Sequence, residues 1–203
     1  MLRIHPIRIV WQPRIALSEG IEHDEEKARE GTNRAVASRR LLRVVCVFVL
    51  ILAAYYAFAA TEIYDDHVFE PYLAINTLLS THVLGMLGEA VDTDGVRIFS
   101  DHFSVTVARG CDGIEPMMLF LAALFAFPTR FVLRLPALLI CLPLLAALNV
   151  VRIVSLFLIG AYHPKLFQVM HTDVWQVLYI AFALVSFGFW LAWATRSQER
   201  AQL

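Results

Sequence analysis

The sequence has little charge and few cysteines, and both shortages narrow what the protein can be. Only 17% of its 203 residues are charged, whereas 59% are hydrophobic, a balance that a soluble domain of this length cannot hide from water. Its three cysteines, Cys46, Cys111 and Cys141, form no CxxC pair and no metal-type spacing. A thiol-disulfide relay and a zinc site are therefore disfavoured, and we expect no metal, no cofactor and no nucleic-acid partner.

The composition instead predicts an all-α polytopic membrane protein that contacts the lipid bilayer. We expect about four transmembrane helices, an amphipathic helix at the outer face and a small extracytoplasmic β-hairpin. A charged cytoplasmic tail is expected at residues 1–40, a membrane domain at 41–195 and a second cytoplasmic tail at 196–203. The first tail lacks the apolar core of a signal peptide. Its charged stretch, residues 22–30, is either a short exposed helix or disordered.

The first apolar run, residues 41–60, is long enough to cross a membrane. Roughly 20 residues at about 1.5 Å each cover a hydrocarbon core of about 30 Å. Arginines crowd the N-terminal side of this run, and acidic residues follow it. The positive-inside rule therefore predicts a cytoplasmic N-terminus and an extracytoplasmic segment after the span.

Residues 72–91 interleave apolar and polar side chains in a two-sided pattern. This pattern favours an amphipathic helix that lies along the outer face or packs on the bundle, rather than a span. Parity agrees with this interpretation. A crossing here would put Cys111 in the cytoplasm and Arg130 and Arg134 outside, against the charge rule.

Residues 92–107 have a different period. Polar and apolar residues alternate at period two, which predicts a small β-hairpin with its turn near Ser100 and Asp101. The hairpin would lie outside the membrane and deliver residues 109–112 to the membrane surface.

Three further apolar runs complete the predicted bundle. We expect spans at residues 113–127, 135–161 and 174–194, the first of them somewhat short for a bilayer. The ends of these runs that should face the cytoplasm carry Arg130, Arg134, Arg196 and Arg200. This distribution again agrees with the charge rule.

Cys111 lies where the chain enters the second span, between Arg109 and Asp112. Cysteine is usually a small inert hydrophobe, and Cys46 and Cys141 fit that interpretation because they lie inside apolar runs. A thiol near a cation and a helix N-terminus has a favoured thiolate, because the charge and the free amide groups stabilise the anion. Cys111 is therefore a candidate nucleophile, with Arg109 and Asp112 as supporting residues.

Two other segments bring polar groups to the same depth. Arg152 lies roughly 25 Å along the third span from Leu135, just beneath the outer boundary of the bilayer core. A charge there costs about 2.5 to 3.5 kcal/mol and normally faces a polar cavity; snorkelling to the headgroups is the alternative. Asn149 shares the helical face of Arg152 and can orient its guanidinium. His171 stands immediately before the fourth span.

Cysteine, histidine and arginine together suffice for acyl transfer. Histidine can take the thiol proton and later protonate the leaving amine. The thiolate then attacks a carbonyl carbon and forms a thioester. Arginine can supply fixed donors to the oxyanion where water is excluded.

At these residues the chain resembles the exosortase/archaeosortase family and looks most like its compact H-type members. The likeness covers residues 107–193 and lies in ARGCDGIEP, LNVVRIVSLFLIG and LFQVMHTDVW. It implies a transpeptidase with Cys111 as nucleophile and Arg152 and His171 as catalytic partners. It also implies the cytoplasmic membrane of a prokaryote, with the active site facing the extracytoplasmic side. Substrates would be membrane-anchored proteins whose C-terminal tail comprises a short motif, one hydrophobic span and a basic end.

Two other functions are alternatives to this enzyme. A non-catalytic membrane chaperone or assembly scaffold would use Arg152 only to bind an anionic lipid or a partner, and it would tolerate Cys111→Ser. A transporter agrees less well with spans that lack an internal repeat and a midplane charge. The identity of the substrate and of the acceptor nucleophile stays open.

Overall fold

A computed structural model describes residues 13–200, with side chains described at residue 31 and from residue 34 onward. The chain divides into two units, Met1–Arg43 and Val44–Leu203. The predicted tail at residues 1–40 begins outside the described residues, but its charged stretch is helical and belongs to α1 (Pro13–Ala59). The predicted C-terminal tail is described as far as Arg200.

Among the described residues, three helices are long and apolar enough to cross a membrane: Arg34–Ala59, Phe131–Tyr162 and Pro164–Arg200. The remaining apolar helix, α4 (Ile114–Ala126), has only 13 residues. Its length of roughly 20 Å falls short of a hydrocarbon core of about 30 Å. The chain is thus a helical multi-pass membrane protein, as predicted, and the second expected span is a short helix.

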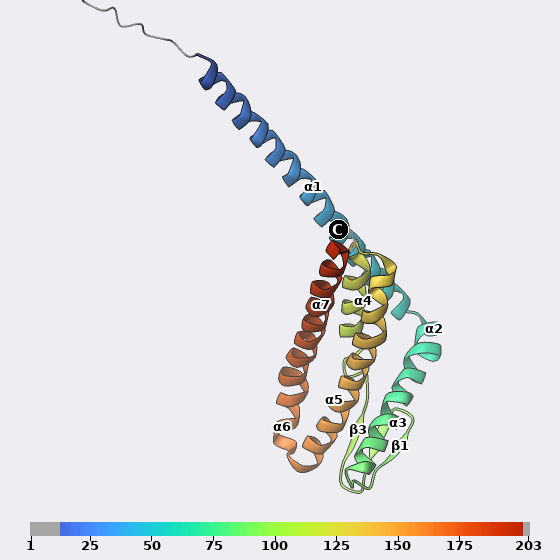
Figure 1. Cartoon of the computed structure of the whole chain (residues 1–203). Coiled ribbons are helices and arrows are strands. Elements are labelled where there is room, and N and C mark those ends of the chain that lie inside the picture. Colours follow the sequence, from blue (N-terminus) through green and yellow to red (C-terminus); the bar gives the residue numbers. More distant parts are fainter. Residues whose placement is uncertain (1–12, 201–203) are drawn as a thin grey trace, which may run out of the picture. The chain divides into compact units, whose positions relative to one another are not determined.

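The two C-terminal spans are each assembled from consecutive helical elements. The first contains η2 (Phe131–Arg134), η3 (Ala137–Cys141) and α5 (Leu142–Tyr162); the second contains α6 (Pro164–Val169), η4 (Met170–Val174) and α7 (Trp175–Arg200). Pro136, Pro143 and Pro164 lie at the starts of η3, α5 and α6, where proline removes a backbone donor and alters the local hydrogen-bond ladder. The helices α4, α5 and α7 pack against one another (Figure 1).

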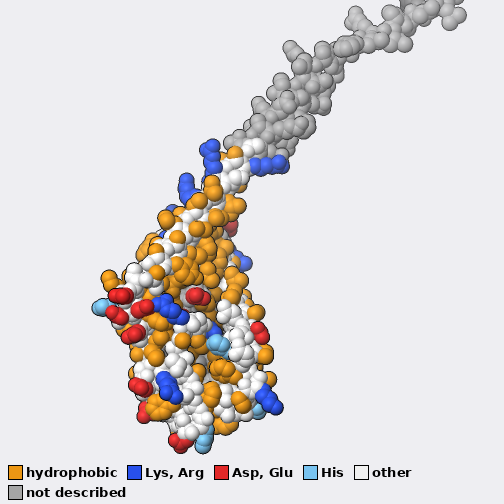
Figure 2. All heavy atoms as spheres, turned by 180° about the vertical axis from the view of Figure 1, so that it is seen from behind, with side chains coloured by type: hydrophobic (Ala, Val, Ile, Leu, Met, Phe, Trp, Pro, Cys, Tyr) orange, Lys and Arg blue, Asp and Glu red, His pale blue; other side chains and the backbone are white. Residues whose placement is uncertain are grey.

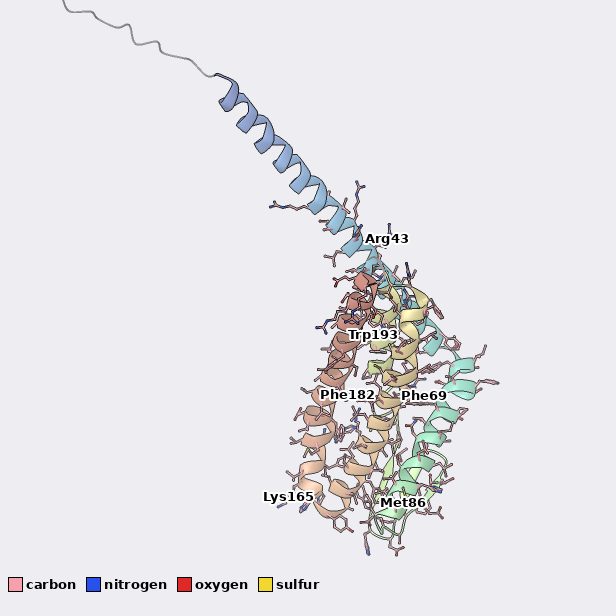
Figure 3. The ribbon with its side chains drawn as sticks, viewed as in Figure 1. Arg43, Phe69, Met86, Lys165, Phe182 and Trp193 are labelled. Atoms are coloured by element: carbon pink, nitrogen blue, oxygen red, sulfur yellow. The ribbon has the colours of Figure 1, made fainter. Side chains whose placement is uncertain are left out.

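The predicted cytoplasmic ends of these helices meet at one end of the bundle. The indole Nε1 of Trp190 donates a hydrogen bond to the carbonyl oxygen of Leu133 at 2.7 Å, so the C-terminal half of α7 lies against η2. Met86 and Lys165 lie at the end away from Trp193 (Figure 3). The arginine-bearing link and the C-terminal arginines therefore share one end, as the charge rule expects.

The helix predicted at residues 72–91 is present but has its polar side turned inward. It is α3 (Glu70–Met86), which continues directly from α2 (Glu62–Tyr64) and η1 (Asp65–Phe69), ends before the predicted residue 91 and packs along α5. The buried side includes Asn76, Thr77 and Ser80, and the exposed side includes Ile75, Leu78, Leu79 and Met86. Of the two placements predicted, α3 therefore takes the one on the bundle. Figure 2 shows apolar side chains over much of one face of the molecule, as a lipid-contacting surface requires.

The predicted hairpin is a three-stranded antiparallel sheet of order β1-β2-β3. Its strands are β1 (Asp92–Asp94), β2 (Arg97–Phe99) and β3 (Ser104–Thr106). The turn predicted near Ser100 and Asp101 connects β2 to β3. The expected hairpin is thus present as β2 and β3, and a third strand joins it because Asp94-Gly95, a typical hairpin dipeptide, makes a second turn and pairs β1 with β2.

One aromatic ring docks the sheet on α5 and α6. Phe103 packs edge-to-face against Phe157 at 5.5 Å and against Phe167 at 6.2 Å between ring centroids. Its ring lies on Gly160, where an added Cβ would come within 2.1 Å of it. The absence of a side chain at Gly160 therefore lets the β2–β3 turn lie against α5 and α6.

Candidate functional site

Cys111 lies in a tight loop that Asp112 holds in place. Asp112 is buried, and its carboxylate accepts hydrogen bonds from the backbone N–H of Gly110 at 3.0 Å and of Ile114 at 2.7 Å. The backbone N–H of Cys111 donates to the carbonyl oxygen of Ala108 at 2.9 Å. The loop is thus fixed on both sides of the thiol, and the same carboxylate satisfies a free amide at the start of α4.

Gly113 is the joint between this loop and α4. Its φ is +76°, and a Cβ at this position would lie 2.6 Å from the Tyr179 hydroxyl and 2.9 Å from the Asn149 amide. Any other residue at this position would be strained, both by the left-handed backbone and by the close approach of these side chains. Gly113 therefore brings the Cys111 loop directly against α5 and α7.

Cys111 and His171 line one cavity of about 210 Å³. The walls include Ile153 and Leu156 of α5 as well as β3 and the loop that follows it. The His171 ring stacks on Phe167 at 5.8 Å, with an angle of 11° between the ring planes, which restricts how the imidazole can turn. No hydrogen bond joins the thiol and the imidazole among the described contacts. The structure thus brings together two of the three predicted residues in one cavity.

Arg152 lies behind the Cys111 loop rather than in that cavity. It is 2% exposed, and its Nη2 donates a hydrogen bond to the carbonyl oxygen of Gly110 at 3.2 Å. It lines a separate void of about 10 Å³ with Gln176 and Tyr179. Within the described part of the chain its Nε has no hydrogen-bond partner. The guanidinium therefore binds the backbone just before the thiol and keeps its buried Nε–H uncommitted.

Asn149 connects α5 to α3. It is fully buried, and its Nδ2 donates to Oδ1 of Asn76 at 3.3 Å. Asn76 in turn donates to the carbonyl oxygen of Tyr72, whose hydroxyl donates to the carbonyl oxygen of Asp112 at 3.0 Å. No hydrogen bond between Asn149 and Arg152 appears among the described residues. The predicted contact between these two side chains is thus replaced by a chain of contacts that reaches the Cys111 loop through α3.

Three residues of this network were missed from the sequence: Tyr72, Asn76 and Tyr179. The Tyr179 hydroxyl donates to the carbonyl oxygen of Leu145 at 2.8 Å and to that of Gly113 at 3.4 Å. An asparagine in a helix expected to pack on a membrane bundle was the available signal for Asn76, because a polar side chain facing a bundle needs a partner. The two tyrosines give no such signal, since tyrosine is common in membrane helices.

Arg109 fixes the loop from its outer side. It is about half exposed, forms a salt bridge with Asp65, and lies 4.6 Å over the Phe69 ring. Its guanidinium contacts η1, whereas Arg109 itself lines the cavity that holds Cys111. Its predicted supporting position is therefore at the edge of the site.

The family model described as transmembrane exosortase (Exosortase_EpsH) matches residues 31–191. The chain belongs to this family. The match covers more than half of the sequence and includes Cys111, Arg152 and His171. A search of curated proteins and of solved structures found no significant match. Membership places the chain among membrane transpeptidases involved in protein sorting.

In this exosortase the environment of the thiol differs from the sequence-based expectation. Burial raises the pKa of the Cys111 thiol above its ordinary value; the Arg152 guanidinium lowers it, and the Asp112 carboxylate raises it. The net shift is upward, because desolvation disfavours the thiolate more than the arginine favours it. The prediction of a favoured resting thiolate was therefore wrong. For this thiol to act as a nucleophile, a base would have to take its proton.

Proposed function

We propose that this exosortase is a cysteine transpeptidase that cleaves the C-terminal sorting signal of exported, membrane-anchored proteins. The cleaved protein is then transferred to an acceptor nucleophile or released at the extracytoplasmic face of a prokaryotic cytoplasmic membrane. The observation that carries the proposal is the cavity shared by Cys111 and His171. It offers a nucleophile and a base to the same substrate atoms, as acyl transfer needs.

The reaction has two balanced halves. In the first, His171 accepts the Cys111 proton, sulfur bonds to the substrate carbonyl carbon, and the imidazolium protonates the departing amine of the tail. In the second, an acceptor amine or water attacks the thioester, and the proton that it loses returns to the thiolate through His171. The upward-shifted pKa of Cys111 supports transfer to His171 during attack rather than a stable resting ion pair.

Arg152 is assigned two roles in this scheme. Its bond to Gly110 holds the backbone that precedes the thiol, and its positive charge favours the thiolate. Its unpartnered Nε leaves a donor for negative charge that develops near Cys111 in the transition state. The charge of a buried arginine beside the Cys111 loop interacts strongly with a developing negative charge, because little water screens it.

The length of α4 supports a site recessed in the outer leaflet. If its C-terminal end lies at the cytoplasmic boundary, its 13 residues rise roughly 20 Å through a core of about 30 Å. Cys111 would then lie several ångströms below the outer boundary. A scissile bond next to a membrane-spanning tail reaches such a depth without leaving the membrane.

A tailed substrate expressed with the protein tests the proposal. Cys111→Ser keeps the size of the side chain but replaces the thiol, so we expect processing of the tail to stop while the protein still accumulates in the membrane. Ser155→Ala is a matched control, because Ser155 lies on α5 and bonds only the carbonyl of Arg152 among the described contacts. Unchanged processing in Cys111→Ser would overturn the proposal.

One observation favours the second candidate, a non-catalytic membrane scaffold. Cys111 is partly buried and its thiol pKa is raised, which also describes an inert packing cysteine. A scaffold would support export equally well with serine or alanine at this position. The Cys111→Ser experiment therefore distinguishes the two functions.

A further inference from the structure

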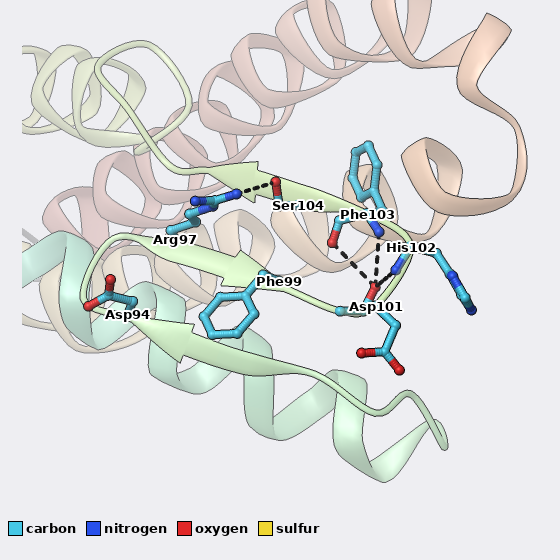
Figure 4. Close-up of a pocket in the computed structure, with 8 residues that line it drawn as sticks. Asp94, Arg97, Phe99, Asp101, His102, Phe103 and Ser104 are labelled. Atoms are coloured by element: carbon cyan, nitrogen blue, oxygen red, sulfur yellow. Dashed lines mark hydrogen bonds between the residues drawn. The ribbon is translucent and has the colours of Figure 1, made fainter.

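β3 lies at the margin of the sheet and leaves one of its edges open. Figure 4 shows β2 between β1 and β3, with no strand on the other side of β3. Ser104 and Thr106 are exposed. An exposed strand edge presents a row of unpaired N–H and C=O groups that a further strand can bind.

The register identifies which main-chain groups face this open edge. The N–H of Val107 donates to the carbonyl oxygen of Val96 at 2.9 Å, so these two residues form a hydrogen-bonded pair. Such pairs alternate along antiparallel strands, and Val105 therefore bonds β2 as well. The main-chain groups of Ser104 and Thr106 point the other way. The described contacts include no partner for either of these N–H groups.

The open edge is part of the cavity that contains Cys111 and His171. Thr106 lines this cavity, and Cys111 follows it by five residues along the same chain. The other residues that line it include Ile153 and Phe167. The cavity is therefore lined both by a strand with unpaired amides and by apolar side chains, the two elements by which proteins bind an extended peptide.

We propose that the residues on the N-terminal side of the scissile bond bind as an added β-strand along the open edge of β3. The inference rests on the proposed function and specifies how that function selects the peptide. The added strand runs parallel to β3, because both chains approach Cys111 with their C-terminal ends. Thr106 supplies the main-chain hydrogen bonds nearest to the thiol, and Ser104 supplies the next pair.

This binding mode has a consequence for specificity. Main-chain hydrogen bonds do not depend on the side chains of the peptide, which gain selectivity only where they meet pockets. Side chains alternate across a strand, so every second residue of the peptide faces the apolar wall. The docking of Phe103 on Gly160 holds the turn that precedes β3 against α5.

Two reagents that alkylate the Cys111 thiol without turnover test the pairing. Acetyl-trialanyl chloromethyl ketone presents a peptide backbone, whereas iodoacetamide does not; mass spectrometry reads the label at Cys111 alone. Thr106→Pro removes the outward N–H but leaves the bonds between β2 and β3, and proline is tolerated in edge strands. We expect the tripeptide reagent to label this variant about tenfold more slowly, with the iodoacetamide rate unchanged.

Thr93→Pro is the matched control. Thr93 lies on β1, the other margin of the sheet, opposite Ile98, and its N–H donates to the side chain of Asp92 instead of to a strand. This variant should label like wild type with both reagents. A second test uses the wild-type protein and tripeptide reagents that are N-methylated at one amide each. Methylation of an amide that bonds β3 should slow labelling, whereas methylation of the next amide along the peptide should not. This result does not depend on the folding of any variant.

Equal tripeptide rates in wild type and Thr106→Pro, or no alternation among the N-methylated reagents, would overturn the strand pairing. An equal loss of labelling by both reagents in Thr106→Pro would also overturn it, because the substitution would then act on the thiol itself. A change of oligomeric state in Thr106→Pro would overturn it as well, because the edge would then pair with a second copy of the chain. Failure of the proposed function would be seen in a different experiment, in which a tailed substrate is still processed by the Cys111→Ser variant.

Discussion

Arg152 donates a hydrogen bond from Nη2 to the carbonyl oxygen of Gly110 at 3.2 Å, and this bond joins a buried charge in α5 to the residue before Cys111. Arg152 is 2% exposed, so the contact is made where little water competes. An arginine that only snorkelled to the headgroups would be exposed at its charged end. The buried position therefore favours the functional interpretation of Arg152 over the snorkelling one.

Arg152→Lys should insert into the membrane normally but process a tailed substrate at least roughly tenfold more slowly, because charge-assisted hydrogen bonds contribute about 1.5 to 3 kcal/mol each. Lysine keeps the charge and loses the planar fork that can bind Gly110 and a developing oxyanion together. The measurement is the processing rate at equal protein level. A rate near that of wild type would show that charge alone is enough.

Gly113→Ala should disturb the site through the backbone. A left-handed alanine costs roughly 1 to 2 kcal/mol, and its Cβ would also clash with Tyr179 and Asn149. We expect the midpoint of thermal unfolding in detergent to fall by roughly 2 to 8 °C. Gly85→Ala is the control, because an added Cβ there meets nothing within 4 Å. Equal midpoints for the two variants would contradict the tight packing of α4 on α5 and α7.

The reactivity of Cys111 should rise with pH beyond the range of an ordinary thiol. Burial raises the pKa of its thiol, so the thiolate fraction at neutral pH is smaller than that of a free cysteine, whose pKa is about 8.5. The iodoacetamide rate at Cys111 should therefore still increase above pH 8.5. Arg152→Met removes the charge that lowers this pKa and should slow the reaction further at pH 8. A rate that reaches its plateau by pH 7 would mean a resting thiolate.

The extracytoplasmic position of Cys111 can be tested by labelling intact cells. A membrane-impermeant thiol reagent should modify Cys111 and should spare a cysteine introduced by Thr129→Cys, because Thr129 lies in the link before Arg130 that we expect to face the cytoplasm. Permeabilised cells provide the control, since both positions should then react. The reverse pattern in intact cells would invert the predicted topology.

The fold class followed from the sequence because apolar runs and flanking arginines are local signals. The inward polar side of α3 did not follow. Asn76, Thr77 and Ser80 are buried, whereas the two-sided pattern alone agrees equally with a helix on the membrane surface. Which side faces the bundle depends on whether the surroundings are water or lipid, and periodicity does not distinguish these cases.

The site was predictable in composition but not in arrangement. The sequence predicted that Cys111, Arg152 and His171 lie at one depth in the membrane. The structure adds that Cys111 and His171 share a cavity while Arg152 lies behind the Cys111 loop. Helical rotation and the bend at Gly113 decide this difference, and neither can be read from spacing along the chain. The sign of the thiol pKa shift was missed for a related reason. Burial depends on packing, and it outweighs the nearby charge.

A thioester at Cys111 is tested most directly by trapping it. A tailed substrate incubated with the wild-type protein in the absence of an acceptor should give an adduct that survives non-reducing electrophoresis and is released by hydroxylamine, because a thioester reacts readily with that nucleophile. His171→Ala should lower the amount of adduct, and Cys111→Ala should give none. An adduct that persists in Cys111→Ala, or tail processing that is indifferent to this substitution, would contradict the cysteine transpeptidase and leave the membrane scaffold.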